Sequence, residues 1–183
     1  MKILKTEFEG LLIVEPKVFE DNRGYFYESY NVNKFKEAGL EHVFVQDNQS
    51  KSSYGVVRGL HYQLEPYAQT KLVRALYGKI LDVVVDIRKN SQSFGKWISL
   101  EISDENKKQL LIPKGFAHGF AVLSDIAVIL YKCDEFYYPE ADRGINYNDR
   151  DLNINWGLNP KDIKVSEKDK LLPVFKHSEM NFK

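Results

Sequence analysis

The strongest constraint on the fold is a run of side chains that alternates with a period of two residues. In residues 79–88, the odd positions from Leu81 to Ile87 are all apolar, and the even positions alternate between aliphatic and aspartate side chains. Alternation of this kind places successive side chains on opposite faces of an extended chain. The segment is therefore predicted to be a β-strand with one wholly apolar face.

Further strand patterns lie on both sides of this segment. Turn residues separate them, including Tyr77-Gly78-Lys79 and Pro113-Lys114-Gly115. Helical signals are few: one short helix is predicted after an asparagine cap at Asn31 or Asn33, and another after Ser166. Short strands with turns between them predict an all-β jelly-roll sandwich or barrel. The strands are predicted at residues 71–76, 79–88, 97–102, 109–112, 116–123 and 127–133.

Length and charge limit the kind of protein that this chain forms. Its 183 residues predict one domain. The 26 basic and 26 acidic side chains give a net charge of zero, which argues against nucleic acid or an anionic membrane as a partner. Charges interrupt the first nine residues, and no run approaches the roughly 20 apolar residues of a membrane helix, so no targeting or membrane segment is expected. The lone Cys133 forms no intrachain disulfide, which suits the cytoplasm.

The histidines favour acid–base chemistry over metal binding. The chain has four, His42, His61, His118 and His177, and no two lie within five residues of each other. A metal-binding β-barrel usually has two or three histidines and a carboxylate, often with two histidines closely spaced. The chain also lacks a phosphate-binding glycine loop, a G-x-S-x-G elbow and a Cys-x-x-Cys pair. A metal site assembled from distant strands remains open.

The segment around His61 combines polar and apolar residues in one predicted strand. Arg58, His61 and Gln63 lie within six positions of the run VVRGLHYQ. Burying each of them without a purpose would be costly, which favours a functional site. A hydrogen-bonded structural histidine is the alternative for His61, and a buried structural tyrosine is the alternative for Tyr131 in the strand at 127–133.

Several longer strings occur in an order that resembles the dTDP-4-dehydrorhamnose 3,5-epimerases. That resemblance spans residues 8–169, and it implies a cupin-type jelly roll of residues 1–183 whose segment from about 160 to 183 folds back over the mouth of the barrel. It also implies a homodimer that uses no metal and no cofactor. The strings are DNRGYFYE (21–28), QDNQS (46–50), RGLHYQ (58–63), QTKLVR (69–74), DVVVDIR (82–88), PKGFAHGF (113–120), YKC (131–133), ND (148–149) and SEKD (166–169).

The resemblance implies a role for each of four catalytic residues. His61 matches the base, and Asp169 matches the carboxylate that orients it. Lys71 matches the cation that stabilises the enolate oxygen. Tyr131 matches the residue that returns a proton on the opposite face of the sugar.

The resemblance also implies substrate contacts, and one of them departs from the family pattern. Where the family often has glutamate, this chain has the shorter carboxylate of Asp142. In this family an N-terminal segment can cross to the partner subunit, so some contacts are expected to come from the other chain. The implied substrate-binding residues are Arg23, Glu28, Gln46, Asp47, Asn48, Arg58, Gln63, His118, Asp142 and Lys168, with Phe19 and Phe26 as base-stacking or wall residues.

The predicted activity is that of an isomerase. It inverts carbons 3 and 5 of dTDP-4-dehydro-6-deoxy-D-glucose to give dTDP-4-dehydro-β-L-rhamnose, in dTDP-L-rhamnose biosynthesis. The nearest alternative is a related enzyme that inverts one carbon only or acts on another nucleotide-linked 4-keto sugar. A metal-dependent cupin enzyme and a non-catalytic sugar-binding module are more distant alternatives.

Overall fold

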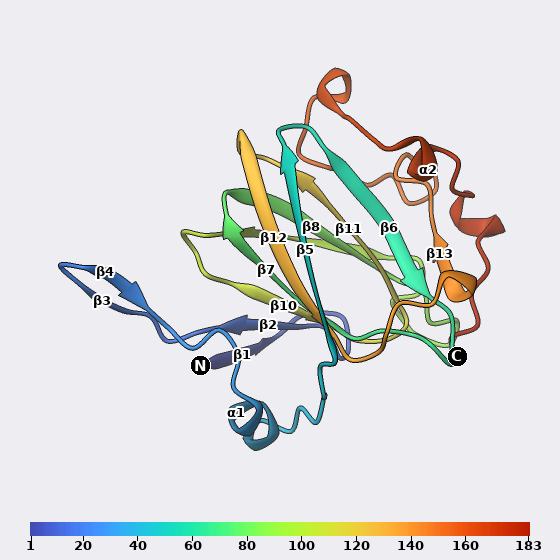
Figure 1. Cartoon of the computed structure of the whole chain (residues 1–183). Coiled ribbons are helices and arrows are strands. Elements are labelled where there is room, and N and C mark those ends of the chain that lie inside the picture. The colour runs from blue at the N-terminus through green and yellow to red at the C-terminus, as the bar shows by residue number, and fades with distance from the viewer.

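Two antiparallel β-sheets pack against each other in a computed structural model that describes residues 1–183 (Figure 1). The first sheet has the order β1 (Lys2–Lys5), β2 (Leu12–Glu15), β10 (Gln109–Ile112), β7 (Lys71–Tyr77), β12 (Ile126–Cys133), β5 (Gln46–Ser53). The second has the order β13 (Asp142–Gly144), β6 (Val57–Gln63), β11 (Phe116–Val122), β8 (Lys79–Asp86), β9 (Trp97–Ser103). The predicted all-β sandwich is confirmed.

The turn at Gly78 lies where the sequence predicts it, but it joins the two sheets. β7 belongs to the six-stranded sheet, and β8 belongs to the five-stranded sheet, where it pairs with β9 and β11. Gly78 adopts a φ of 74°, and a Cβ atom there would lie 2.0 Å from the carbonyl oxygen of Ile126. β8 packs apolar side chains on both sides of its sheet: Val83 and Val85 on one side, and Ile80 and Val84 on the other, where the aspartates of the strand lie between them. It therefore requires a central position rather than a place in a two-stranded hairpin.

The polar strand β5 has no apolar pattern in the sequence. It is an edge strand whose only neighbour is β12. Gln46, Asn48 and Ser50 are partly buried, and the residues between them are exposed. The first set faces a cavity between the sheets and the second faces solvent. Because neither face packs in a core, both faces are polar.

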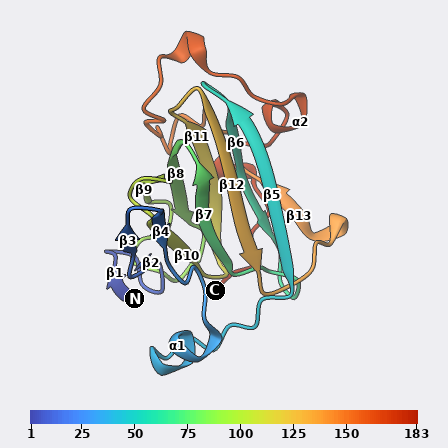
Figure 2. The ribbon, with the colours of Figure 1, turned by 60° about the vertical axis from the view of Figure 1, so that its left-hand side comes forward.

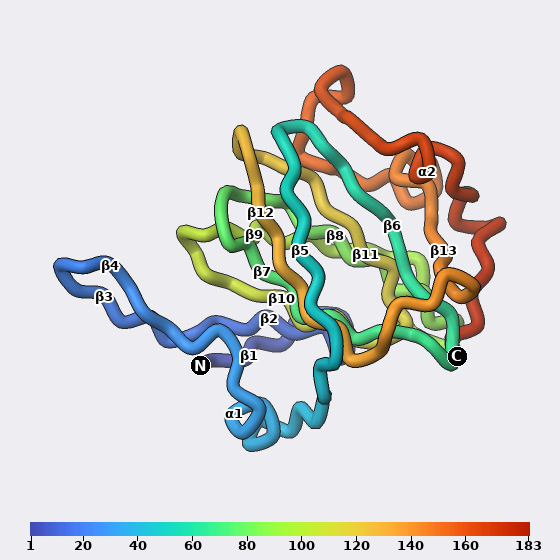
Figure 3. The backbone as a smooth tube through the Cα atoms, in the orientation of Figure 1, coloured from blue at the N-terminus to red at the C-terminus, as the bar shows by residue number.

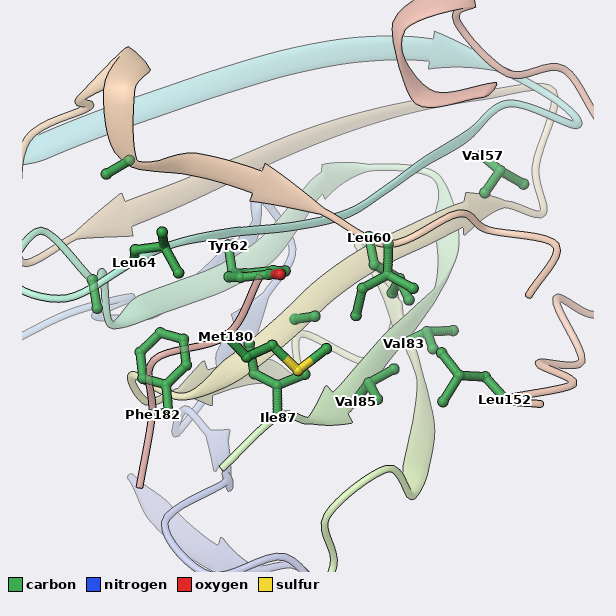
Figure 4. Packing of buried hydrophobic residues seen from close by; sticks show 14 of the residues in the cluster. Val57, Leu60, Tyr62, Leu64, Val83, Val85, Ile87, Leu152, Met180 and Phe182 are labelled. Atoms are coloured by element: carbon green, nitrogen blue, oxygen red, sulfur yellow. The ribbon is translucent and has the colours of Figure 1, made fainter. Parts of the chain in front are cut away.

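The main cores lie on both sides of the five-stranded sheet. Between the sheets, Val73 and Ile129 of the six-stranded sheet pack with Val84 and Phe120 of the other. On the outer face, Leu60 and other side chains of β6 and β8 pack against the C-terminal segment (Figure 4). Figure 4 shows this second cluster, in which Met180 and Phe182 come from that segment and Leu152 comes from the chain before it.

The predicted helices form at their predicted caps. α1 (Val32–Glu37) follows Asn31, whose side chain accepts hydrogen bonds from the backbone N–H groups of Asn33 and Lys34. α2 (Glu167–Lys170) follows Ser166, which caps it in the same way. Three short 3₁₀ turns complete the chain: η1 (Pro139–Ala141), η2 (Pro160–Asp162) and η3 (Phe175–His177). No helix is long and apolar enough to cross a membrane.

A two-stranded hairpin, β3 (Phe19–Asp21) with β4 (Gly24–Phe26), extends away from the sandwich. Figure 3 traces it as the blue arm that projects from the body, and Figure 2 shows it beside the edge formed by β1 and β2. At the other end of the chain, the red and orange C-terminal segment lies along β6 and β13. The β3–β4 arm and the C-terminal segment therefore lie at different parts of the sandwich.

Gly119 is expected to be needed for the close approach of β6 and β11. A Cβ atom at Gly119 would lie 2.6 Å from the carbonyl oxygen of Arg58 and 3.3 Å from the Cα atom of Gly59. Because backbone must move, Gly119→Ala should lower the free energy of unfolding by about 3 kcal/mol, measured by urea denaturation. The control Gly39→Ala meets nothing within 4 Å and should cost only its left-handed backbone, about 1 kcal/mol. Equal losses in the two variants would contradict this packing.

Candidate active site

The candidate site is a cleft between the two sheets. Two adjoining cavities of about 510 and 470 Å³ form it, and they share His61, Lys71, Tyr131 and Lys168 as lining residues. His61 lies on the five-stranded sheet, whereas Lys71 and Tyr131 lie on the six-stranded sheet. The side chains therefore reach one space from opposite walls. A separate hollow of about 630 Å³ beside Arg88 shares no residue with this cleft.

His61 and Asp169 form a hydrogen-bonded pair in the first cavity. Nε2 of His61 lies 2.8 Å from Oδ1 of Asp169, across 108 positions of sequence. An ionised carboxylate only accepts hydrogen bonds, so the Nε2 atom of His61 carries the proton and donates it. In the neutral imidazole, this tautomer leaves the lone pair on Nδ1. The His61 side chain is 34% exposed, so this imidazole is accessible to a molecule in the cleft.

The local structure of α2 holds Asp169 in place. Ser166 Oγ accepts a hydrogen bond of 3.1 Å from the backbone N–H of Asp169, and the N–H of Gly59 donates to Asp169 Oδ2 at 3.1 Å. Burial raises the pKa of Asp169, but the hydrogen bonds from His61 and Gly59 outweigh it and bring the pKa below its ordinary value. The carboxyl group is therefore ionised at neutral pH, as its partnership with His61 requires.

Lys71 and Tyr131 stand together on the opposite wall. The Nζ atom of Lys71 lies 5.9 Å from the centre of the Tyr131 ring. Burial lowers the pKa of Lys71, while the nearby Cys133, Asp142 and Asp82 act in the other direction. Burial raises the pKa of the Tyr131 phenol. At neutral pH Tyr131 is therefore protonated and is a proton donor.

A second imidazole–carboxylate pair lies next to the first. His118 on β11 is the direct register partner of His61 on β6. Its Nε2 atom lies 2.9 Å from Oδ2 of Asp82, and both side chains are buried. The other oxygen of Asp82, Oδ1, is buried without a hydrogen-bond partner. Burial raises the pKa of Asp82, and the charges of His118 and Lys71 oppose that rise.

Comparisons with known proteins identify the family. The family model described as dTDP-4-dehydrorhamnose 3,5-epimerase matches residues 5–177. The chain is 56% identical over 171 residues to the dTDP-4-dehydrorhamnose 3,5-epimerase of Shigella flexneri, covering 92% of this chain and 93% of that protein. The chain belongs to the dTDP-4-dehydrorhamnose 3,5-epimerase family. The predicted family is confirmed.

Solved structures of this family have the same fold. The crystal structure of dTDP-4-dehydrorhamnose 3,5-epimerase from Elizabethkingia anophelis has a TM-score of 0.92 at 55% identity and covers 96% of this chain and 97% of that one. The 3,5-epimerase from Legionella pneumophila, in complex with dTDP-4-keto-L-rhamnose, has a TM-score of 0.92 at 46% identity and covers 96% of this chain and 93% of that one. The epimerase fold therefore extends over nearly the whole chain.

Three of the predicted substrate-binding residues form the charged rim of the epimerase cleft. Arg58 lines the first cavity, and its Nε atom donates to Ser52 Oγ at 3.0 Å. Lys168 lines both cavities and pairs with Asp142 at 2.7 Å across the second cavity. The hydrogen bond to Asp142 raises the pKa of Lys168. The shorter carboxylate of Asp142 thus lines the cleft and already has a partner.

The predicted residues on β5 and β6 divide between two environments. Gln46 and Asn48 line the second cavity, as does Gln63. Asp47 points to the other side of β5 and pairs with Lys132 at 3.0 Å, outside the cleft. The alternation of the strand decides this, because neighbouring residues face opposite sides.

Four predicted residues lie away from the cleft of their own chain. Arg23, Phe19 and Phe26 belong to the β3–β4 arm, where Arg23 pairs with Asp21 in the turn. Glu28 follows the arm and pairs with Lys34 of α1. A small cavity of about 260 Å³ near Met1 includes Phe19, Phe26 and Glu28, but none of the four lines the catalytic cleft.

Sequence reasoning missed Asp82, Ser166 and Tyr137 as parts of the site. Asp82 appears in the sequence only as a polar position in an apolar strand, although its interruption of that face is a signal. Ser166 was recognised as a helix cap but not as the support of Asp169. Tyr137 gave no signal, because it lies in an irregular loop. The chain contains no group of three His, Cys, Asp or Glu side chains that could hold a metal ion.

Asp169 is expected to make the folded chain sensitive to acid. Its pKa is lowered from 3.8, so its ionised form stabilises the folded chain above that pH, and this contribution is lost as the pH falls through the lowered pKa. Asp169→Asn removes the titrating group. Its free energy of unfolding should therefore fall less than that of the wild type between about pH 4 and pH 2, measured by urea denaturation.

The control for this experiment is Asp125→Asn, an exposed residue in the bend between β11 and β12. It should keep the acid dependence of the wild type. If the free energy of unfolding of Asp169→Asn fell with acid as much as that of the wild type, His61 would not be stabilising the ionised form of the Asp169 carboxyl group.

Proposed function

We propose that this chain inverts carbons 3 and 5 of dTDP-4-dehydro-6-deoxy-D-glucose and so forms dTDP-4-dehydro-β-L-rhamnose. The observation that carries the proposal is that a paired imidazole and a phenol reach one cavity from opposite sheets, with an ammonium group beside the phenol. Inversion of a carbon centre needs a base on one face, an acid on the other, and a cation for the oxyanion between them. The Legionella relative was solved with dTDP-4-keto-L-rhamnose bound, which supports this substrate class.

His61 acts as the base in this proposal. Its Nδ1 lone pair takes the proton from the carbon beside the 4-keto group, and the C–H electron pair moves into the ketone to give an enolate. The imidazole becomes positively charged, and the buried carboxylate of Asp169, 2.8 Å from Nε2, stabilises that charge. His61 then releases its proton to solvent through the exposed side of the ring.

Lys71 and Tyr131 complete the reaction from the other wall. The ammonium group of Lys71 stabilises the enolate oxygen, where charge develops. Tyr131 donates its phenolic proton to the carbon on the face opposite His61, and the phenolate recovers a proton from solvent. Repetition of the step at the second carbon beside the ketone inverts both centres.

The charged rim suits the nucleotide diphosphate. Arg58 and Lys168 line the first cavity together with Lys164. Guanidinium and ammonium groups bind phosphate oxygens through charge-assisted hydrogen bonds. Since Asp142 pairs with Lys168, a bound diphosphate competes with that carboxylate for the ammonium group.

The reaction predicts the fate of hydrogen at two carbons. In deuterated water, every inversion places a solvent-derived deuterium on the inverted carbon, because His61 and Tyr131 exchange with solvent. In the proton NMR spectrum of the product, the signals of the hydrogens on carbon 3 and carbon 5 should therefore both be lost.

His61→Asn should reduce turnover by at least about 10³-fold, because it removes the base.

The control for His61→Asn is His177→Asn, which lies on η3 and does not line the cleft. It should keep wild-type turnover, and His61→Asn should keep most of its affinity for dTDP. Deuterium at a single carbon would support the mono-epimerase alternative. Turnover of His61→Asn within about tenfold of the wild type would refute the assigned base.

We further propose that the enzyme is a cytoplasmic homodimer in which the β3–β4 arm completes the cleft of the partner. The arm projects from the sandwich and leaves Phe19 and Phe26 53% and 67% exposed. Exposed aromatic side chains on a projecting element are typical of an interface. This arrangement would account for the position of Arg23, which lies outside its own cleft. The unpaired, buried Cys133 suits a reducing compartment.

Mixing two inactive variants tests the exchange of arms. Arg23→Ala damages the arm, and His61→Asn damages the cleft, so a hybrid dimer with exchanged arms contains one intact site. Unfolding and refolding the mixture should restore about a quarter of wild-type turnover, since half of the dimers are hybrids with one working site of two. Each variant refolded alone is the control. No recovery in the mixture would show that each arm serves its own chain.

A further inference from the structure

The carboxylate of Asp169 is carried by a segment that belongs to neither sheet. α2, which contains it, has only four residues, and residues 160–173 around it form no strand of the sandwich. A helix of one turn is unstable on its own, because too few hydrogen bonds compensate for the lost conformational freedom. The position of Asp169 is therefore fixed by contacts between this segment and the sheets.

The chain before α2 is anchored to the beginning of β6. The N–H of Val57 donates to the carbonyl oxygen of Lys164 at 2.9 Å, and the N–H of Lys164 donates to that of Gly55 at 2.8 Å. The approach is close, because a Cβ atom at Gly55 would lie 2.1 Å from the carbonyl oxygen of Asp162. These contacts hold the segment on the N-terminal side of α2.

The chain after α2 is held by an asparagine side chain. Nδ2 of Asn146 donates hydrogen bonds to the carbonyl oxygens of Lys170, at 3.0 Å, and Leu172, at 3.3 Å. The backbone N–H of Asn146 donates to the carbonyl oxygen of Pro173 at 2.8 Å. Both N–H bonds of the amide group therefore hold carbonyl groups that lie within three positions of Asp169.

Asn146 is itself attached to the pair of strands that carries His61. The preceding residue, Ile145, exchanges two backbone hydrogen bonds with Leu60, at 3.0 and 3.1 Å, and Leu60 precedes His61 in the chain. Gly144 is the register partner of His61 itself. A closed path thus leads from His61 through Asn146 to the end of α2, and from Asp169 back to His61.

Packing supports the same path. A Cβ atom at Gly144 would lie 2.6 Å from Cδ1 of Leu172, so the chain after α2 lies directly against the backbone of β13. Asn146 lines neither cavity of the cleft. Its effect on the reaction therefore passes through other residues.

We infer that Asn146 is a positioning residue, which fixes the end of α2 so that the carboxylate of Asp169 stays against Nε2 of His61. The inference rests on the proposed function and deepens it. A carboxylate that orients an imidazole and stabilises its charge acts at hydrogen-bond distance. A displacement of about 1 Å would therefore slow the reaction although every reacting group is still present.

The first test is the turnover of Asn146→Leu, which removes the amide group and keeps a side chain of similar size. The backbone hydrogen bond to Pro173 remains, so the segment should stay docked. Lys170 is exposed and Leu172 is only partly buried, so water can replace the lost hydrogen bonds. At saturating substrate, Asn146→Leu should lower kcat about tenfold.

A double variant shows whether Asn146 acts through Asp169. Asp169→Asn should lower kcat by about 10³-fold, because it removes the carboxylate that orients the base. Adding Asn146→Leu to Asp169→Asn should cause no further loss, since the group that Asn146 positions is already gone. A further tenfold loss in the double variant would overturn the inference.

Proton NMR of the enzyme without substrate tests the position of the pair directly. An imidazole N–H that is held against a carboxylate is protected from exchange with solvent and gives its own low-field signal. Two such signals are expected, from the Nε2 atoms of His61 and His118, and His61→Asn identifies the first. In Asn146→Leu the His61 signal should be lost to exchange. The His118 signal should remain, because its partner Asp82 lies on β8, and a general loss of structure would remove both.

The matched control is Asn106→Leu. Asn106 precedes β10, donates from Nδ2 to the carbonyl oxygen of Glu101 at 2.9 Å and accepts from the N–H of Ser103 at 3.1 Å. It lines neither cavity of the cleft, so kcat and both NMR signals should match those of the wild type. If Asn146→Leu fails to fold, Asn146→Ala, which removes the same hydrogen bonds without adding an apolar side chain, supplies the same comparison.

The outcomes separate this inference from the proposed function. A wild type that does not convert the keto sugar refutes the proposed function, and the NMR comparison still tests the position of Asp169. A wild type that converts it, with an Asn146→Leu variant that keeps either its kcat or its His61 signal, overturns the inference alone.

Discussion

The hydrogen bond between His61 and Asp169 connects β6 to a segment 108 positions later in the chain. It requires that the C-terminal segment pack on the outer face of the five-stranded sheet, which Met180 and Phe182 accomplish by joining the core there. The same segment supplies Lys168 to the rim of the cleft. The packing of the C-terminal segment, the hydrogen bonding of His61 and the shape of the cleft therefore depend on one another.

The space between the sheets contains both an apolar core and the candidate active site. Phe120 and Val84 belong to the apolar cluster between the sheets, whereas Lys71, Asp82 and His118 place titratable side chains in the same space. Burial disfavours the charged forms of Lys71 and Asp82. The attraction between these two opposite charges offsets that cost only in part. We interpret this unfavourable arrangement as the cost of a preorganised site for an oxyanion.

Alternation and turn chemistry predicted most of the sandwich, because each is a local property. The pattern of β8, the glycine turn at Gly78 and the caps at Asn31 and Ser166 all lie where the sequence indicates. The polar strand β5 was missed because a strand between solvent and a cleft has no apolar face. Local patterns also could not predict that β7 and β8, on either side of Gly78, belong to different sheets, because packing between distant segments determines which strands pair. For the site, the sequence motifs indicated His61, Lys71, Tyr131 and Asp169. The structure brings these four side chains to one cavity.

The sequence by itself determined the family, the all-β character and the identity of the chemical groups, because these follow from local patterns and from strings of residues. Only the tertiary structure decided which groups meet. It separated Asp47 from its neighbours on β5, left Arg23 on a projecting arm and turned the amide of Gln63 toward the backbone of a loop. The physical reason is that facing, burial and hydrogen-bond partners are set by contacts between segments distant in sequence. No spacing within a single segment encodes those contacts.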